Sequence, residues 1–344
     1  MARVAVDLLG GDAGPGVVAD AIAAILADPA AAGFDPDNEL SLCLIGPDET
    51  VAALLRERSI DLDEHPSLRV LHAGDCVPMT ASSHDTLALL RERDDLSSVV
   101  GVEAVRDGRV DAFVSIGHTG ATVGASVLGL GRITGMGRPG LAVELPSARG
   151  PVVLVDCGAA PHATAEDLVR FAAAGSAYAR IIGIPEPRIG LLSIGGERGK
   201  GDHLRKQADV RLEEEFGDAY AGAVEGHDLV GEPSADVVVV DGFTGNIALK
   251  SMEGALRWSV GVMAKAYGSF EPAREVLRTS HFLSGGSLLG VAGNIVVGHG
   301  ASSADEVVAC IRRAALLNAG SLTDRVREAL GGFAPLNSRG ELAT

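Results

Sequence analysis

The sequence predicts a doubly wound α/β fold, with helices on both faces of a mostly parallel sheet. Three observations predict it: seven short apolar runs, a Gly-rich turn after each run, and helix-like segments between them. The runs are continuous rather than alternating, which is typical of strands buried on both faces. Hydrophobic residues make up 47% of the 344 residues, so a large core can form. No low-complexity linker interrupts the pattern, and we predict a single α/β domain over residues 1–344.

The apolar runs mark the predicted strands in chain order. They are Val4–Asp7, Leu42–Ile45, Ala112–Ile116, Val152–Asp156, Ile189–Ile194, Val237–Asp241 and Ile295–Val297. Helices predicted over Val17–Ala27, Ala165–Ala179 and Ala304–Leu317 fit as the crossovers that connect parallel strands. The fold prediction rests on repetition of this strand–turn–helix unit and not on any single match.

The Gly-rich turns predict where a ligand binds. In a doubly wound sheet each turn leaves the carboxyl end of a strand and leads to the N-terminus of a helix, so the turns gather along one edge. Backbone N–H groups and helix dipoles make such an edge attractive to anions. We therefore expect a phosphate or carboxylate site that is built from several loops.

Residues 247–280 do not follow the repeated strand–turn–helix pattern. Ile247–Ala266 reads as a helix that carries the only tryptophan, Trp258, and a more polar piece, Phe270–Arg278, follows it. We predict a projecting helical segment here. A core or dimer helix is favoured over a helix that contacts a membrane.

Charge and composition exclude several classes of protein. The formal net charge is −17, whereas a nucleic-acid-binding protein needs clustered Lys and Arg. The N-terminal residues read as a strand rather than a signal peptide, and no stretch of about 20 apolar residues could span a membrane. The four cysteines form no CxxC pair and suit a reducing cytoplasm as free thiols. The prediction is a cytoplasmic protein that binds no nucleic acid.

Common catalytic and cofactor motifs fail on inspection. Gly135–Gly140 matches GxGxxG, but it contains a proline, follows no apolar strand and opens no helix. Gly195–Gly201 resembles a P-loop with one residue too few and with Gly201 in place of the Ser or Thr. Neither a GxSxG elbow nor an HExxH pair is present. No motif in the sequence indicates a bound metal or cofactor.

Several segments, in order, resemble the PlsX family of phosphate acyltransferases, and they cover most of the chain. They are Val4–Asp12, Gly131–Pro139, Gly175–Ala179, Pro187–Leu192, Asp236–Asn246, Ser287–Gly290 and His299–Ser303. The most specific of them, Asp236–Asn246, reads DVVVVDGFTGN. The resemblance implies a fold like those of isopropylmalate dehydrogenase and phosphotransacetylase.

The resemblance also implies a function and partners. Family members transfer an acyl group from acyl carrier protein to inorganic phosphate, which gives acyl phosphate for phospholipid synthesis. They form homodimers and associate peripherally with the membrane, here at its inner face. Phosphate is itself the nucleophile, so no activated Ser or Cys is required, in agreement with the motifs that are absent.

The resemblance implies two catalytic residues, Lys200 and Asn246. The lysine would neutralise phosphate and developing charge, and the amide would orient the phosphate or the carbonyl. The alternatives are a solvated loop lysine and a turn or helix-capping asparagine. The predicted substrate-binding residues are Gly117, His118, Thr119, Gly120, Gly158, Gly199, Asp241, Thr244, Gly245 and His299. His299 reads equally as a turn histidine, and Asp241 and Asp156 read as helix caps rather than catalytic bases.

Four positions at the predicted site depart from the family's usual pattern. His118 and Ala160 replace amide residues, and Gly196 and Arg198 stand where acidic residues are common. The chain is either a divergent member, in which His118 donates the hydrogen bond of an asparagine, or a paralogue with a different acyl donor or acceptor. Retention of Lys200 and of the Asp241–Asn246 string favours phosphate acyl transfer.

Two further interpretations come from other classes. One is a non-catalytic module that only docks acyl carrier protein, and the other is an NAD-dependent decarboxylating dehydrogenase on the related fold. The dehydrogenase needs a carboxylate metal cluster that the sequence does not offer. Because acyl carrier protein is acidic, an acidic enzyme must present a local basic patch to it. The candidates for that patch are Arg132, Arg138, Arg170 and Arg180.

Overall fold

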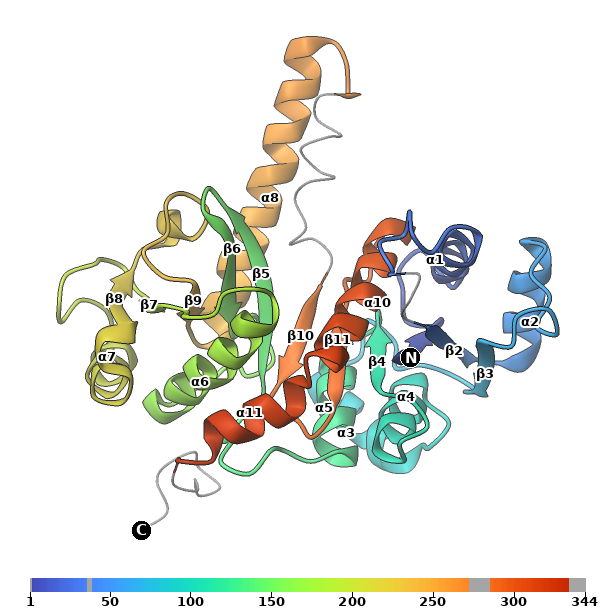
Figure 1. Ribbon diagram of the computed structural model, residues 1–344, viewed down its shortest axis with the longest axis horizontal. Helices are drawn as coiled ribbons and strands as arrows, with labels where there is room; N and C mark the ends of the chain where they lie inside the picture. The colour runs from blue at the N-terminus through green and yellow to red at the C-terminus, as the bar shows by residue number, and fades with distance from the viewer. Residues whose placement is uncertain (1, 36–38, 272–284, 334–344) are drawn as a thin grey trace. The chain divides into compact units, whose positions relative to one another are not determined.

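The computed structural model describes residues 2–35, 39–271 and 285–333 (Figure 1). Contacts between Cα atoms divide the chain into two compact units. The first unit comprises residues 1–133 and 284–325, and the second comprises residues 134–283 and 326–344. Each unit has its own set of paired strands and its own helices. The expectation of one acyltransferase domain over residues 1–344 stays a prediction.

The strands of the first unit lie in the order β3-β2-β1-β4-β11-β10. All of these neighbours are parallel except β10 and β11, which are antiparallel. The strands are β1 (Ala2–Asp7), β2 (Leu40–Gly46), β3 (Leu68–His72), β4 (Ala112–Ser115), β10 (Gly286–Leu289) and β11 (Asn294–Val297). The helices are α1 (Gly16–Ala27), α2 (Asp48–Glu57), α3 (Ser83–Glu92), α4 (Ser97–Arg106), α5 (Thr119–Gly129) and α10 (Ala304–Ala319).

Helices cover both faces of this unit, as the apolar runs predict. Figure 1 shows α1 and α10 on one side of the strands and α3, α4 and α5 on the other. On the first side, Val6 of β1 belongs to one buried cluster with Ile22 of α1 and Ile311 of α10. On the second side, Gly101 of α4 lies directly against the ring of Phe113 of β4. The doubly wound arrangement is therefore confirmed.

The strands of the second unit lie in the order β5-β6-β9-β7-β8. Here β5 and β6 form an antiparallel pair, and the other neighbours are parallel. The strands are β5 (Gly140–Ser147), β6 (Gly150–Val155), β7 (Ile189–Leu192), β8 (Tyr220–Val224) and β9 (Val237–Val239). The helices are α6 (Ala165–Ile181), α7 (His203–Phe216) and α8 (Gly242–Tyr267). The last described helix, α11 (Leu322–Leu330), has residues in both units.

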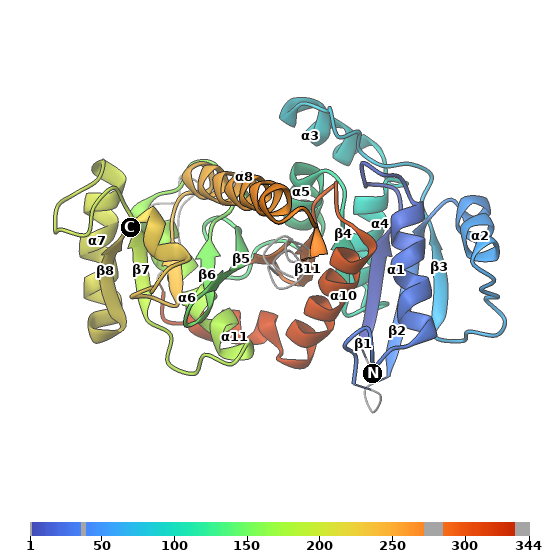
Figure 2. The same cartoon turned by 90° about the horizontal axis from the view of Figure 1, so that it is seen from above.

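The helical excursion predicted within residues 247–280 is the helix α8, which begins earlier, at Gly242. It runs for 26 residues and extends well past the ends of β5 and β6 (Figures 1 and 2). The polar piece predicted at Phe270–Arg278 falls largely outside the described residues. All seven predicted strands coincide with observed ones, and several of them end before their predicted last residue because the chain turns into its Gly-rich loop.

Candidate active site

Asp241, at the carboxyl end of β9, builds the N-terminus of α8. Its carboxylate accepts hydrogen bonds from the backbone N–H and the hydroxyl of Thr244, each at 2.9 Å. This N-cap arrangement satisfies an N–H group that the first helical turn would otherwise leave unpaired. The capping role predicted for Asp241 is confirmed. Asn246 does not cap the helix; it lies within α8, near its start, with an exposed side chain.

A buried arginine that sequence analysis missed, Arg205, binds the other side of Asp241. Its Nη2 donates to Oδ2 of Asp241 and, at 3.1 Å, to the hydroxyl of Thr244. Its Nε donates to the carbonyl oxygen of Leu192 at 3.4 Å, at the end of β7. Arg205 stands in the first turn of α7, three residues after the N-cap residue Asp202. Its position behind a Gly-rich turn was the only signal in the sequence that could have indicated it.

The ion pair with Arg205 favours the charged form of Asp241. Burial disfavours the carboxylate of Asp241, but the hydrogen bonds from Thr244 and the charge of Arg205 outweigh it. The pKa of Asp241 is therefore held below its usual value. A carboxylate of low pKa accepts a proton poorly at neutral pH, so Asp241 is a structural anion rather than a general base.

A second buried carboxylate, Asp156, shapes the loop after β6. It accepts hydrogen bonds from the backbone N–H groups of Leu141, Gly158, Ala159 and Ala160 at 2.6–2.9 Å. Burial raises the pKa of Asp156 to about 6, although these four bonds favour its charged form. Its interpretation as a helix cap is wrong, because Thr164 caps α6. Asp156 instead holds the loop that carries Gly158.

The start of α8 packs directly on this loop. A Cβ atom on Gly245 would lie 1.9 Å from the carbonyl oxygen of Asp156, so no other residue fits there without a shift of the backbone. A Cβ atom on Gly158 would lie 3.5 Å from Cβ of Asn246, which places these two residues in contact distance. The structure thus brings Gly158, Gly245 and Asn246 together, beside Asp241.

The loop of Lys200 wraps around Arg205. Gly199 and Gly201 have φ angles of +79° and +96°, which favour glycine. A Cβ atom on Gly201 would lie 2.6 Å from Cβ of Arg205 and 2.9 Å from Oγ of Ser193, an oxygen that is buried and has no hydrogen-bond partner. The side chain of Lys200 is 53% exposed, and its Nζ lies 3.9 Å from Glu197. Its ammonium group is therefore only weakly engaged within the protein.

In the first unit, three loops meet at the carboxyl ends of β1, β4 and β11. A Cβ atom on Gly10 would lie 2.2 Å from Cα of Gly117, and the N–H of Asp12 donates to the carbonyl oxygen of Gly300 at 2.7 Å. Beneath them, the hydroxyl of Ser115 donates to Oδ2 of Asp7 at 3.0 Å. The predicted residues Gly117, His118, Thr119, Gly120 and His299 lie on these loops or at the start of α5.

Both predicted histidines use their rings to order these turns. Nδ1 of His118 accepts the N–H of Ala121 at 3.1 Å and caps α5, so the ring proton belongs on Nε2, 3.3 Å from the carbonyl oxygen of Ala81. Nδ1 of His299 accepts the N–H of Ala301 at 3.1 Å. His118 thus directs its donor to the protein itself, and the interpretation of His299 as a turn histidine agrees with its contact.

The predicted site residues form two groups, one in each unit. The first unit holds Gly117, His118, Thr119, Gly120 and His299, and the second holds Gly158, Gly199, Lys200, Asp241, Thr244, Gly245 and Asn246. In the second group Lys200 lies on the loop that leads to α7, and the buried Arg205 stands in the first turn of that helix. This combination suits a bound anion. Among the described residues, no group of three or more His, Cys, Asp or Glu could hold a metal ion.

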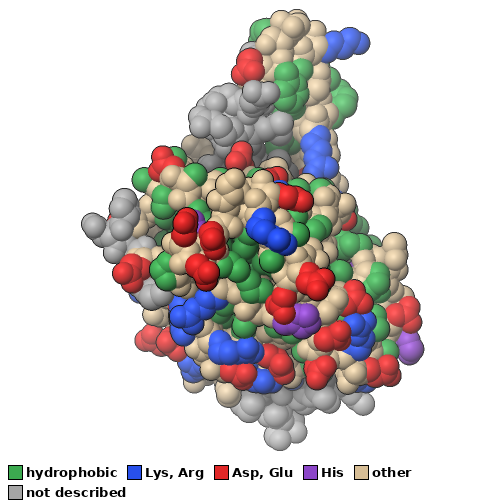
Figure 3. Space-filling model, turned by 90° about the vertical axis from the view of Figure 1, so that its right-hand side faces the viewer, with side chains coloured by type: hydrophobic (Ala, Val, Ile, Leu, Met, Phe, Trp, Pro, Cys, Tyr) green, Lys and Arg blue, Asp and Glu red, His purple; other side chains and the backbone are tan. Residues whose placement is uncertain are grey.

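The basic patch predicted for acyl carrier protein is partly wrong. Arg170 is fully buried, where it donates to the carbonyl oxygen of Gly135 at 2.7 Å and pairs with Glu166 at 2.9 Å. It cannot contact a docked protein. The face drawn in Figure 3 has acidic and basic side chains interspersed, without a broad basic patch. Arg138 stays a candidate because its side chain is 43% exposed.

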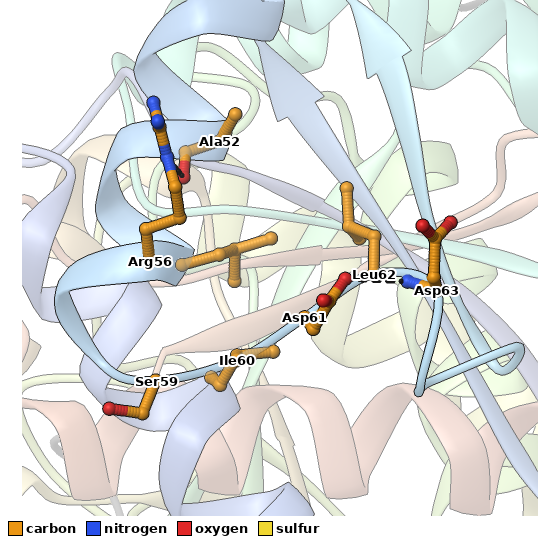
Figure 4. Close-up of a pocket in the computed structure, with 8 residues that line it drawn as sticks. Ala52, Arg56, Ser59, Ile60, Asp61, Leu62 and Asp63 are labelled. Atoms are coloured by element: carbon orange, nitrogen blue, oxygen red, sulfur yellow. Dashed lines mark hydrogen bonds between the residues drawn. The ribbon is translucent and has the colours of Figure 1, made fainter.

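A cavity of 560 Å³ in the first unit lies away from these loops (Figure 4). It follows the C-terminus of α2 and is lined by Leu55, Arg56 and the segment 59–63. It contains none of the predicted site residues. In doubly wound sheets ligands bind at the carboxyl ends of strands, and this cavity instead precedes the amino end of β3. The candidate site is therefore formed by the loops at the carboxyl ends of the strands and not by this cavity.

Comparison with known proteins identifies the family. Residues 2–324 match the family described as "Fatty acid synthesis protein". The phosphate acyltransferase of Thermobifida fusca is 36% identical over 347 residues, which cover 96% of this chain and 91% of that protein. The phosphate acyltransferase of Thermus thermophilus is 38% identical over 341 residues, which cover 95% and 98%. The chain belongs to the PlsX family of phosphate acyltransferases.

Solved structures support the fold independently. A phosphotransacetylase from Streptococcus pyogenes has a TM-score of 0.61 at 20% identity and covers 92% of this chain, with 94% of its own length matched. A branched-chain phosphotransacylase from Enterococcus faecalis has a TM-score of 0.59 at 14% identity, with 92% and 99% covered. The predictions of a phosphotransacetylase-like fold and of an acyltransferase enzyme in lipid synthesis are confirmed. No helix in the described part of the chain is long and apolar enough to cross a membrane.

Proposed function

We propose that the chain transfers an acyl group from acyl-(acyl carrier protein) to inorganic phosphate and releases acyl phosphate for phospholipid synthesis. The observation that carries this proposal is the similarity to phosphate acyltransferases along nearly the whole chain. The loops of the second unit add support, because they retain Lys200, Asn246 and the Asp241 cap in one neighbourhood. We place the reaction in the cytoplasm, where acyl thioesters of the carrier would be available.

The proposed reaction needs a held anion rather than an activated side chain. A phosphate oxygen attacks the thioester carbonyl carbon, the C–S bond breaks, and the carrier thiolate leaves with the electron pair. Lys200 balances the charge of the phosphate and of the developing oxyanion, and the amide of Asn246 fixes the orientation of one of them. Arg205 is already paired with Asp241, so its role is to position α7 against α8.

The experiment is a trapping assay with purified protein, long-chain acyl-(acyl carrier protein) and phosphate. Hydroxylamine converts acyl phosphate into hydroxamate, which is measured by mass spectrometry. We expect hydroxamate that rises with phosphate concentration and is lost when phosphate is omitted. An intact thioester with no product would overturn the proposal and favour a different acyl donor or acceptor, or a module that only docks acyl carrier protein. Binding of phosphate without turnover would favour the different acyl donor or acceptor, whereas no binding of phosphate would favour the docking module.

We also propose that α8 serves homodimer formation and peripheral attachment to the inner face of the membrane. Exposed apolar side chains at Phe243, Ile247, Trp258 and Val262 are spaced four, eleven and four residues apart, which places them on one stripe of the helix. Leu249 and Val260, on the opposite side of α8, are buried. An exposed apolar stripe of this length needs a partner surface.

Trp258 reports on both associations, because it is the only tryptophan and is 72% exposed. We expect its emission to shift to shorter wavelength as protein concentration rises through the dimerisation range, and again when anionic lipid vesicles are added. Emission typical of exposed tryptophan under both conditions would contradict the two assignments. Sedimentation with and without vesicles gives the matching measure of mass.

A further inference from the structure

A cavity of 290 Å³ lies at the amino ends of β1, β2 and β3 in the first unit. Its polar lining comes from Arg3, Ser41, Cys43, Arg69 and Arg109. The strand register explains why they gather: Arg3 pairs with Ser41 in the adjacent strand, and Cys43 pairs with Arg69. Paired residues, and residues two apart in a strand, project from the same face of a sheet. The first four side chains therefore share one face, and Arg109 joins them from the loop before β4.

Two of the three arginines donate no hydrogen bond to a carboxylate among the described residues. Arg3 differs, because it donates to Asp111 at 2.5 and 3.2 Å and to the carbonyl oxygen of Gly108 at 2.8 Å. Arg109 lies 3.7 Å from Asp107, a carboxylate that already accepts Nε of Arg106 at 2.9 Å. Arg69 forms no ion pair within the part of the chain that the structure describes. The cavity thus holds two guanidinium groups that are not hydrogen-bonded to a carboxylate, although Arg109 keeps its longer contact with Asp107, in a chain of net charge −17.

The thiol of Cys43 lines the cavity together with Arg69 and Arg109. Burial raises the pKa of Cys43, and the charges of Arg69 and Arg109 oppose that rise. The side chain of Cys43 is 8% exposed. It therefore lies at the cavity wall, near both cations, and can serve as a local reporter.

We propose that this cavity binds a phosphate group, either free or carried by a small metabolite. Guanidinium groups present planar pairs of N–H donors that match phosphate oxygens, and two of them balance a dianion. The volume lies near the lower end of about 300–1,000 Å³ that is typical of small-molecule sites, which limits the ligand to a small one. Leu71, which lies two residues after Arg69 and so on the same face of β3, and Val110 provide an apolar wall for an organic group attached to the phosphate.

This site is separate from the candidate active site. The strands β1 and β4 are parallel, so their amino ends and their carboxyl ends lie at opposite edges of the sheet. The loops with Gly10 and Gly117 follow the carboxyl ends, whereas the cavity lies beside Arg3 at the beginning of β1. A ligand here would be an effector or a second metabolite, not the phosphate that attacks the thioester.

The test uses the full chain and two probes, inorganic phosphate and phenyl phosphate. Calorimetric titration measures affinity, and peptide mass spectrometry measures the alkylation rate of Cys43 by iodoacetamide with and without probe. We expect each probe that binds in the cavity to slow alkylation of Cys43, and the paired variant Arg69→Gln, Arg109→Gln to weaken that binding by about tenfold or more. Tighter binding of phenyl phosphate would indicate an esterified ligand, and equal binding would indicate free phosphate.

Matched variants locate any binding that is seen. Arg56→Gln, at the 560 Å³ cavity beside α2, should leave both measurements unchanged. Lys200→Ala, which removes the exposed cation of the candidate active site, should not restore the alkylation of Cys43. Retained affinity and retained protection of Cys43 in the paired variant would overturn the proposal. Calorimetric binding that leaves Cys43 unprotected would also overturn it, since the anion would then be bound elsewhere. The absence of binding by either probe would overturn it as well. None of these outcomes depends on acyl transfer, so they are distinct from failure of the proposed function.

Discussion

Replacing Lys200 with alanine is expected to lower phosphate-dependent hydroxamate formation by about 10²–10³-fold, the usual effect of losing one group that stabilises developing charge. The reason lies in the surroundings of Lys200. Its ammonium is half-exposed and 3.9 Å from Glu197, so it is available to an anion, whereas Arg205 is committed to Asp241. Arg198, the other cation of this loop, is paired with Glu213.

The controls separate catalysis from folding. Lys200→Arg should recover only part of the rate, since the charge is kept but its position and shape change. Lys206→Ala, on the exposed side of α7, should leave the rate unchanged. Because the long contact with Glu197 is the only ion pair of Lys200 among the described residues, the melting temperature of Lys200→Ala should match that of the parent. A rate within a few-fold of the parent would remove Lys200 from the proposed mechanism.

The strands could be predicted where burial on both faces leaves a continuous apolar run. Val152–Val155 and Val237–Val239 are of this kind, since all their side chains are buried. The strand β3 was missed because it pairs at one edge only, and Arg69 and His72 interrupt its pattern with exposed polar side chains. The strand β5 was missed because Glu144 and Pro146 break the run.

The candidate site could be predicted where its geometry is local. Asp241 and Thr244 are three residues apart, which is the spacing of an N-cap and the N–H that it accepts. Arg205 meets Asp241 across 36 residues, and only the packing of α7 beside β7 and β9 decides that its guanidinium is buried there. Sequence patterns report periodicity and turns, and neither of them reveals a long-range ion pair.

Losing Arg205 is expected to destabilise the protein strongly. In Arg205→Gln the carboxylate of Asp241 stays buried without its cation, and breaking such a pair costs about 3–5 kcal/mol of the free energy of unfolding. Arg211→Gln, on the same helix, removes ion pairs with Glu166 and Glu214. Glu166 keeps its pair with Arg170, so this variant should cost at most about 1 kcal/mol. Urea titration of both variants at neutral pH checks the difference.

The dependence on pH tests whether the ion pair is the cause. The folded protein holds the pKa of Asp241 below its usual value, so the stability that the carboxylate contributes is present above about pH 4 and is lost as pH falls further. The difference between parent and Arg205→Gln should therefore shrink when the titration is repeated below that pH. Adding Asp241→Asn to Arg205→Gln should recover part of the loss at neutral pH, because no charge is then left buried. Equal losses at both pH values, with no recovery in the double variant, would mean that Arg205 stabilises α7 through packing and not through its charge.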